Sequence, residues 1–391
     1  MFSHRTNWQL SPNRLTQALE EMRLVGTKIL DLSASNPTRV GLFYDERAIL
    51  DSLASAKSLD YDPQSKGLRT AREAVANYYR NEHGVRDFDL ERLVLTTSTS
   101  EGYSYVFGLL CNPGEELLVP KPSYPLFDFL ADLEDVKLVP YPLIYDHGWQ
   151  MDFPSLERGV TPRTRAVVIV HPNNPTGSYV QRQELPLLNT FCRKHNLALI
   201  VDEVFLDYAH DGRRRSTFAA NEDVLTFTLS GLSKISALPQ MKVAWVAANG
   251  PAQDVDAAMA RLEVIADTYL SMNAPTQWAM PVLLDQCQSI QKQLLVRVSA
   301  NLAELDRQLA AQKTCQRLEV QGGWYAVLRV PVTKSDEDLA IDLLREKSVL
   351  VHPGHFYDFP GDGHLVLSLI TPEEEFKRGI ARAIEELLIA D

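Results

Sequence analysis

A lysine that follows the end of a predicted buried strand is the strongest chemical signal in the sequence. The run 224–229 is rich in apolar and β-branched residues, which is typical of a buried strand, and Ser230 and Gly231 end it. Lys234 comes next, and a second apolar run begins at Val243. A lysine fixed between two buried strands is poorly solvated, which favours its neutral amine as a nucleophile for Schiff-base formation. A solvated loop lysine is the alternative, and the motifs upstream argue against it.

Two further predicted strands end in polar side chains suited to a ligand. The apolar run 166–170 leads into the turn His171-Pro172-Asn173-Asn174-Pro175-Thr176-Gly177, which presents Asn174 at a strand end, where α/β sheets bind ligands. Asp202 closes the apolar run 197–201, where an unpaired carboxylate is costly, so we expect it to have a cationic partner. The alternatives are a plain Asn-Pro turn and an N-cap for the next helix.

A fourth junction has the features of a phosphate site. The strand predicted over residues 93–96 is followed by a run of serines and threonines that opens a helix, with Thr99 and Ser100 in its first turn. Backbone amides at a helix start lack partners within the helix and bind phosphate well, above all beside hydroxyl side chains. A simple Ser/Thr cap without a ligand is the alternative, and the two readings are compatible.

Taken in their order along the chain, the motifs resemble those of the class I and II aminotransferases, which are fold type I enzymes that use pyridoxal 5′-phosphate (PLP). The resemblance covers nearly the whole chain and includes the segment Ser230-Gly231-Leu232-Ser233-Lys234, with the base Lys242 eight residues after the lysine. It implies that Lys234 forms a Schiff base with PLP and that Asp202 pairs with the protonated pyridine nitrogen. It also implies that Asn174 donates to the phenolic oxygen and contacts the substrate.

The resemblance assigns further cofactor contacts to residues whose own signals are weaker. These residues are Tyr61, Thr99, Ser100, Tyr124, Phe205, Ser233 and Lys242. Tyr61 is expected to reach the cofactor phosphate of a partner subunit, and Tyr124 to stack on the pyridine ring. Phe205 stands where relatives usually have a tyrosine, Lys242 where they have an arginine and Ser98 where they usually have a glycine. A packed core or interface tyrosine is the alternative for Tyr61 and for Tyr124.

The partner of the substrate carboxylate is the least defined part of the predicted site. Many relatives carry an arginine on the last strand, where this chain has Val366. Because a carboxylate entering a desolvated cleft needs a cationic or multi-donor partner, we expect Arg39, in the segment that the family lays over the active-site mouth, to take this role. Lys66 and Arg329 are the competing candidates, and a solvated turn residue is the alternative for Arg39.

The resemblance implies transfer of an amino group between an L-amino acid and a 2-oxo acid. Lys234, once displaced by the substrate, is expected to move the proton at the α-carbon. A PLP-dependent lyase or decarboxylase remains an alternative, because fold does not determine reaction type. A PLP-sensing transcription regulator is disfavoured, because the chain has neither a spare N-terminal module nor the basic charge of one. No metal is expected.

Length and composition agree with a two-lobed globular enzyme. The chain has 391 residues, 45% of them hydrophobic and 23% charged. Its net charge of −12 disfavours nucleic acid as a partner. The four cysteines are scattered without metal or redox spacing, the N-terminus lacks the apolar core of a signal peptide, and no apolar run reaches the length of a membrane span. We therefore expect a cytoplasmic protein.

The predicted architecture is α/β. Strands alternate with helices over about residues 90 to 250, which indicates a mostly parallel sheet, and the resemblance implies the three-layer large domain of fold type I with a smaller α+β domain. We expect residues 1–45 to contribute to the small domain, residues 46–285 to form the large PLP-binding domain and residues 286–391 to form the small C-terminal domain. A homodimer with shared active sites is expected from the resemblance.

Overall fold

An eight-stranded mixed sheet forms the centre of the computed structural model, which describes residues 1–270 and 272–389. Its strands, in spatial order, are β2 (Leu93–Thr96), β9 (Ala244–Asn249), β8 (Thr226–Gly231), β7 (Ala198–Asp202), β6 (Thr164–Val170), β3 (Glu116–Lys121), β4 (Lys137–Tyr145) and β5 (Trp149–Met151). The five strands from β8 to β4 run parallel, whereas β9 is antiparallel to both of its neighbours and β5 to β4. The prediction of a mostly parallel sheet is confirmed.

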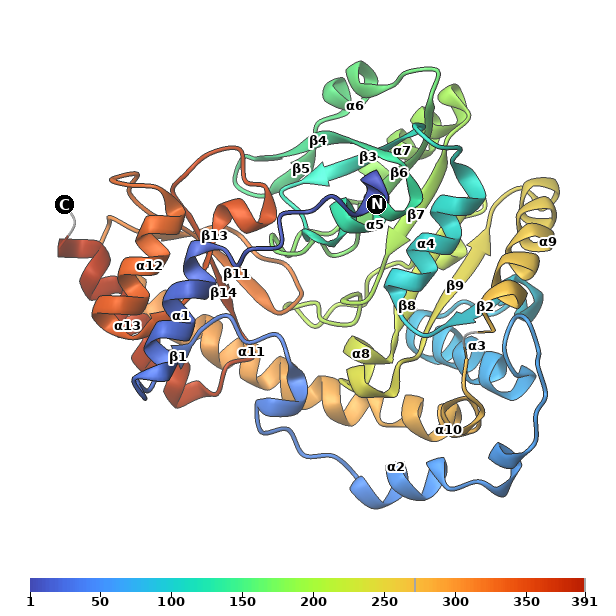
Figure 1. Ribbon diagram of the computed structural model, residues 1–391, viewed down its shortest axis with the longest axis horizontal. Coiled ribbons are helices and arrows are strands. Elements are labelled where there is room, and N and C mark those ends of the chain that lie inside the picture. Colours follow the sequence, from blue (N-terminus) through green and yellow to red (C-terminus); the bar gives the residue numbers. More distant parts are fainter. Residues whose placement is uncertain (271, 390–391) are drawn as a thin grey trace.

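Helices cover both faces of this sheet and make a three-layer arrangement (Figure 1). One face packs against α4 (Thr99–Leu110), α5 (Leu126–Glu134) and α9 (Ala252–Tyr269). The other packs against α3 (Arg69–His83), α6 (Phe153–Gly159), α7 (Glu184–His195) and α10 (Ala274–Asp285). Burial on both faces explains why the parallel strands read as continuous apolar runs in the sequence.

A smaller antiparallel sheet lies beside the large one, at the left of Figure 1. Its strands, in spatial order, are β10 (Gln316–Arg317), β11 (Tyr325–Arg329), β14 (His364–Ser368) and β13 (His352–Pro353). Its helices are α11 (Cys287–Leu309), α12 (Asp336–Lys347) and α13 (Glu373–Ile389). Within residues 1–270 and 272–389, no helix combines the length and apolarity needed to cross a membrane.

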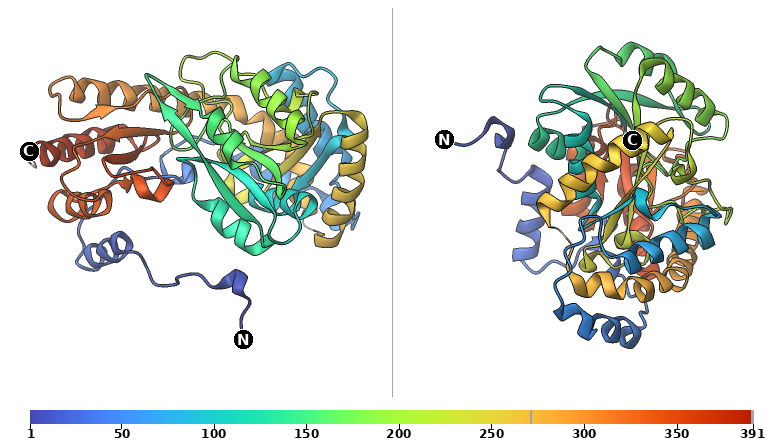
Figure 2. Two further views of the ribbon diagram at one scale, coloured as in Figure 1. Left: turned by 90° about the horizontal axis from the view of Figure 1, so that it is seen from above. Right: turned by 90° about the vertical axis from the view of Figure 1, so that its right-hand side faces the viewer.

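The N-terminal segment packs against this smaller unit. Helix α1 (Arg14–Leu24) contacts α12, and β1 (Leu30–Asp31) pairs in parallel with β12 (Val349–Leu350). The residues before α1 run along the outside of the molecule (Figure 2) and dock on α5, where the Trp8 indole N–H donates to Asp132 at 2.7 Å. Helix α2 (Glu46–Leu53) then leads to the large sheet.

Short 3₁₀ turns complete the chain. They are η1 (His4–Thr6), η2 (Pro37–Arg39), η3 (Ala56–Leu59), η4 (Leu90–Arg92), η5 (Phe218–Ala220), η6 (Pro239–Met241) and η7 (Gly354–Tyr357). One α-helical turn, α8 (Leu232–Ile235), follows β8 directly and carries Lys234.

Two loops, which follow the carboxyl ends of β6 and β7, are linked by backbone hydrogen bonds to the segment that leads into β11. The Gln321 N–H donates to Gly177 O at 3.2 Å, and the Gly323 N–H donates to Tyr208 O at 2.9 Å. Gly177 has a φ of +69°, and a Cβ there would lie 2.4 Å from Gly322 O, so only glycine permits this contact. The turn containing Asn174 and the loop after Asp202 are thereby fixed against the smaller unit.

Helix α4 approaches the sheet closely at its first turn. A Cβ at Gly102 would lie 3.0 Å from the side chains of Leu229 on β8 and Val246 on β9, which are both buried. Glycine at this position lets the start of α4 lie against β8, the strand that leads to Lys234.

Candidate active site

The amine of Lys234 lies against two aromatic rings. Its Nζ is 4.9 Å from the ring centroid of Trp324 and 5.4 Å from that of Phe205, and it forms no hydrogen bond with any residue that the structure describes. Burial lowers the pKa of Lys234 to about 8, and the opposing attraction of the Asp202 charge is the smaller effect. Lys234 therefore has a large neutral fraction near pH 8, as a nucleophilic amine requires.

Asp202 ends β7 and faces the same space. Burial raises the pKa of its carboxyl to about 6, against the effect of the Val204 N–H at 3.0 Å, the Tyr103 hydroxyl at 3.1 Å and the Lys234 charge. The carboxylate is thus mostly ionised at pH 7 in a poorly solvated position. A cationic N–H donor placed there would be strongly favoured.

The two adjacent asparagines of the 171–177 turn have different roles. Asn173 holds the turn, since its side chain accepts from the Thr176 hydroxyl at 2.8 Å and donates to Pro122 O at 3.2 Å. Asn174 is also buried, yet its Oδ1 has no hydrogen-bond partner among the described residues. An orphaned buried polar atom costs about 1–3 kcal/mol, so Asn174 is suited to a ligand that completes its bonding.

The loop after Asp202 contributes two aromatic residues with separate functions. Phe205 is buried and turns its ring toward the Lys234 amine. Tyr208 is buried too, but its hydroxyl donates to the backbone carbonyl of Lys234 at 2.6 Å. Tyr208 therefore supports the lysine's backbone and does not replace a tyrosine at position 205.

The start of α4 combines a cap with free hydroxyl groups. Ser98 is the N-cap and accepts from the Glu101 N–H at 3.1 Å, while the Glu101 carboxylate accepts from the Thr97 N–H at 2.6 Å. Thr99 and Ser100 are half-buried, and their hydroxyls form no hydrogen bond within the described part of the chain. The first-turn amides and these hydroxyls together suit an anion such as phosphate.

Three other residues that are predicted to bind the cofactor differ in how far they are buried. Ser233 is half-buried beside Lys234 in α8. Tyr124 follows β3 and is 45% exposed, and its pKa is raised by partial burial and by the charge of Asp202. Lys242 is exposed at the end of η6, in a left-handed conformation with a φ of +53°. Ser233 and Tyr124 thus lie close to residues of the site, whereas Lys242 is exposed to solvent in the single chain.

Tyr61 and Arg39 each line a separate cavity. Tyr61 is 82% exposed and lines a cavity of about 490 Å³ with Leu270 and Asn273. Arg39 is exposed and lines a cavity of about 520 Å³ with Asp31 and His352.

The competing cations have partners within the chain. Lys66 forms an ion pair with Glu91, and Glu263 lies 3.9 Å away. The Arg329 guanidinium lies 5.4 Å from the ring centroid of Tyr145. Val366 is fully buried on β14, where it pairs with Val327 and His352.

Sequence reasoning missed two residues of the site. Trp324 supplies the ring nearest to the Lys234 amine, and Tyr103 donates to Asp202. Tyr103 lies four positions after Thr99 in the same helix, and this spacing places the two on neighbouring turns of one face. Trp324 follows the pair Gly322-Gly323, a sign of close backbone packing, but no pattern in the sequence connects it with Lys234.

Residues 27–382 match the family described as aminotransferase class I and II. The chain belongs to this family. It is 30% identical over 374 residues to the glutamate-pyruvate aminotransferase AlaA of Haemophilus influenzae, and the match covers 92% of each protein. It is also 30% identical over 372 residues to an alanine aminotransferase of Mycobacterium tuberculosis, covering 93% of this chain and 85% of that protein. The protein is an aminotransferase.

Solved structures agree with this fold. A crystal structure of an aminotransferase from Escherichia coli has a TM-score of 0.88 at 25% identity and covers 99% of this chain, with 98% of its own length matched. The alanine aminotransferase of Pyrococcus furiosus has a TM-score of 0.90 over the whole of both chains at 22% identity, which speaks for the fold alone. The predicted fold type I architecture is confirmed.

The buried carboxylate of Asp202 should make the cofactor-free aminotransferase less stable at neutral pH. Its folded-state pKa of about 6 lies above the ordinary 3.8, so its contribution is favourable below pH 4 and is lost as the pH rises through 6. We expect Asp202→Asn to raise the free energy of unfolding by about 1–3 kcal/mol at pH 8 and by much less at pH 4.5. Urea unfolding at both pH values measures this difference.

Asp256→Asn is the matched control, because Asp256 is an exposed carboxylate on α9. Its substitution should leave the stability difference between the two pH values as in the wild type. If Asp202→Asn and Asp256→Asn change the free energy of unfolding equally at both pH values, Asp202 must be well solvated.

Proposed function

We propose that this aminotransferase binds PLP and uses Lys234 to transfer an amino group between an L-amino acid and a 2-oxo acid. The observation that carries the proposal is the Lys234 amine, which lies against Trp324 and Phe205 with a pKa lowered to about 8, in the field of the buried Asp202. The names of the two relatives make alanine, glutamate and pyruvate the first substrates to assay.

The residues of the site fit PLP in their chemistry. Asp202 would hold the pyridine N–H, the side-chain N–H of Asn174 would donate to the phenolic oxygen, and Tyr124 would lie on the ring. The free hydroxyls and first-turn amides at Thr99 and Ser100 would bind the phosphate, with Ser233 and Lys242 beside it. When bound, PLP supplies an aldehyde for covalent attachment and a ring that accepts electrons from the substrate's α-carbon.

The protein's own contribution is positioning and proton transfer. The Lys234 amine is neutral in a large fraction near pH 8, so it can accept a proton from the α-carbon and return it, a role typically worth about 10²–10⁴-fold. Trp324 and Phe205 limit the water around this amine, which favours its neutral form without a counter-charge in contact. Asp202 keeps its negative charge in place because Tyr103 and the Val204 N–H donate to it.

Covalent attachment of PLP to Lys234 is the direct test. Borohydride treatment of the PLP-loaded protein should fix the cofactor to the peptide that contains Lys234, identified by mass spectrometry. Lys234→Ala should lose turnover by at least about 10²-fold and still bind PLP non-covalently. Lys292→Ala, at an exposed lysine of α11, should behave like the wild type. Attachment to another lysine would refute the role of Lys234.

For the substrate carboxylate we propose Arg39. Its guanidinium is exposed, lines the 520 Å³ cavity and has no ion-pair partner within the described residues. The cavity adjoins the smaller sheet, since His352 also lines it and is paired with Val366 on β14. Lys66 is less suited, because its amine is engaged by Glu91.

Arg39→Ala should raise the KM for both the amino acid and the 2-oxo acid by about 10–100-fold, as expected for a lost charged hydrogen bond. Steady-state kinetics with each substrate varied in turn measure the effect, and PLP absorbance should stay unchanged. Arg47→Ala is the control, at an exposed arginine of α2. Unaltered KM values in Arg39→Ala would assign the carboxylate to another residue.

We also propose that the enzyme is a homodimer in which Tyr61 completes the active site of the other subunit. The cavity that Tyr61 lines is bordered by Leu270, and both side chains are mostly exposed in the single chain, at 82% and 65%. Leu59, which lies two positions before Tyr61 in the sequence, is 89% exposed. Exposed apolar residues gathered around one cavity favour contact with another protein surface.

Mixed dimers test the sharing of sites. Tyr61→Ala and Lys234→Ala homodimers should each have low activity at limiting PLP. A hybrid of the two should regain up to about half of the wild-type activity, because one of its two sites then has both an intact Lys234 and an intact Tyr61. Activity of co-refolded mixtures, with sedimentation to establish dimers, measures this. No recovery in verified hybrids would place Tyr61 outside the partner's site.

A further inference from the structure

The lysine-bearing turn is held by side chains from three other parts of the chain. Helix α8 has only four residues, and a single turn is too short to be stable alone. Its terminal carbonyls accept from outside: Lys234 O from the Tyr208 hydroxyl at 2.6 Å, and Ile235 O from Gln291 Nε2 at 3.0 Å. Ala237 O accepts from the Tyr44 hydroxyl at 2.9 Å. The backbone under Lys234 therefore depends on these donors.

Gln291 is itself oriented by a buried carboxylate. The same Nε2 that donates to Ile235 O also donates to Asp207 Oδ2 at 2.8 Å. An amide nitrogen has two hydrogens, so both are used, one toward Asp207 and one toward α8. Because a carboxylate only accepts, Asp207 forces the nitrogen end of the Gln291 amide to face it.

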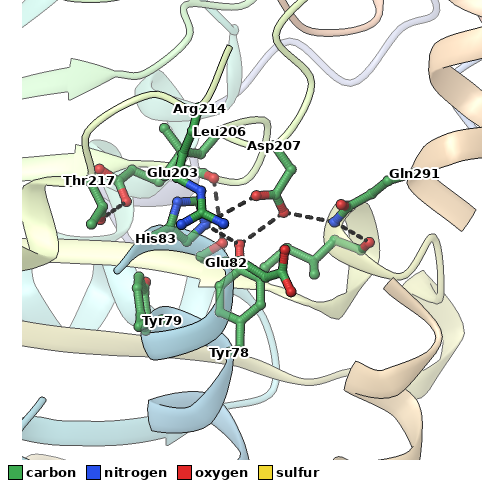
Figure 3. Close-up of polar contacts among 12 residues, drawn as sticks. Tyr78, Tyr79, Glu82, His83, Glu203, Leu206, Asp207, Arg214, Thr217 and Gln291 are labelled. Atoms are coloured by element: carbon green, nitrogen blue, oxygen red, sulfur yellow. Dashed lines mark hydrogen bonds and ion pairs between the residues drawn. The ribbon is translucent and has the colours of Figure 1, made fainter. Parts of the chain in front are cut away.

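Asp207 is fixed in turn from helix α3. Figure 3 shows Tyr78, His83 and Gln291 converging on its carboxylate. The Tyr78 hydroxyl donates to Oδ2 at 2.9 Å, and His83 Nε2 lies 3.1 Å from Oδ1. The side chains of His83 and Asp207 are only 3% and 9% exposed. With Tyr78 and Gln291 donating to Oδ2, His83 in contact with Oδ1 and little water around it, this carboxylate is held in one orientation.

We propose that Asp207 and Gln291 are positioning residues for Lys234, with Asp207 orienting Gln291 and Gln291 fixing the end of α8. The inference rests on the proposed role of Lys234. Asp207 lies in the loop between Asp202 and Tyr208, so one segment carries a charged residue of the site, a donor to the Lys234 carbonyl and the anchor for Gln291. These contacts thereby fix the position of Lys234 relative to Asp202.

The test compares two glutamines of helix α11. Gln291→Leu removes the bridge, whereas Gln288→Leu makes the same change one turn away, where Gln288 donates to Glu82 at 2.8 Å on the surface. The measurement is the pH dependence of Lys234 labelling by trinitrobenzenesulfonate in the PLP-free protein, followed by peptide mapping. This labelling reports on the Lys234 amine whether or not the protein transfers amino groups. Its result therefore does not depend on whether the proposed function is correct.

In the wild type and in Gln288→Leu, the labelling midpoint should lie near pH 8, as burial of the amine requires. In Gln291→Leu, the freed end of α8 should let the amine reach water, and the midpoint should rise toward the ordinary 10.5. Asp202, the charged group that faces Lys234, is unchanged in both variants. The same midpoint in both glutamine variants would overturn the proposal.

Kinetics and a double-mutant cycle give a second readout. Gln291→Leu should lower kcat by about 10–100-fold with KM within about twofold, because a displaced proton-transfer group affects the chemical step and not substrate binding. Asp207→Asn should have the same effect, and the double variant no more than the larger single one, since Asp207 acts through Gln291. Additive effects would overturn this. If Gln291→Leu does not fold, Gln291→Asn removes the bridge with a shorter amide.

Discussion

The burial of one lysine amine is the constraint on which the rest of this site depends. Lys234 lies on the turn α8 that follows β8, against the rings of Trp324 and Phe205, and the loss of water lowers its pKa to about 8. An exposed lysine would be almost wholly charged at neutral pH and of little use as a nucleophile. The close approach of α4 at Gly102 and the contact of Gly177 with Gly322 bring the surrounding elements near this amine.

The buried carboxylates of Asp202 and Glu203 show the energetic cost of this arrangement. Burial raises the pKa of Asp202 to about 6 and that of Glu203, the next residue, to about 7. Glu203 is held by the Thr217 hydroxyl and the Phe218 N–H, both at 2.6 Å, and so fixes the loop that begins at Asp202. Charged groups kept in a poorly solvated core lower stability in exchange for a defined active-site geometry.

The fold and the main site residues could be predicted because their signals are local. Apolar runs bounded by Gly, Pro and polar residues gave the parallel strands, and Lys234, Asn174 and Asp202 all follow such runs. In an α/β sheet these strand ends meet at one edge, so chain order alone suggests that the three residues converge.

The residues that sequence reasoning missed act through contacts between distant parts of the chain. Tyr103 and Asp202 are 99 positions apart, and Gln291 and Ile235 are 56 apart. No periodicity or turn signal reports such pairs, because they depend on how helices pack over the sheet. The same holds for Lys66, whose ion pair with Glu91 is visible only in three dimensions.

A half-reaction with the PLP-loaded wild-type protein tests the central claim most directly. An amino acid that the enzyme accepts, added without any 2-oxo acid, should yield one equivalent of its 2-oxo acid per Lys234 and then stop. Adding a second 2-oxo acid should restart the reaction and give the corresponding new amino acid. Continued product formation or release of carbon dioxide without an acceptor would contradict amino-group transfer and indicate a lyase or decarboxylase.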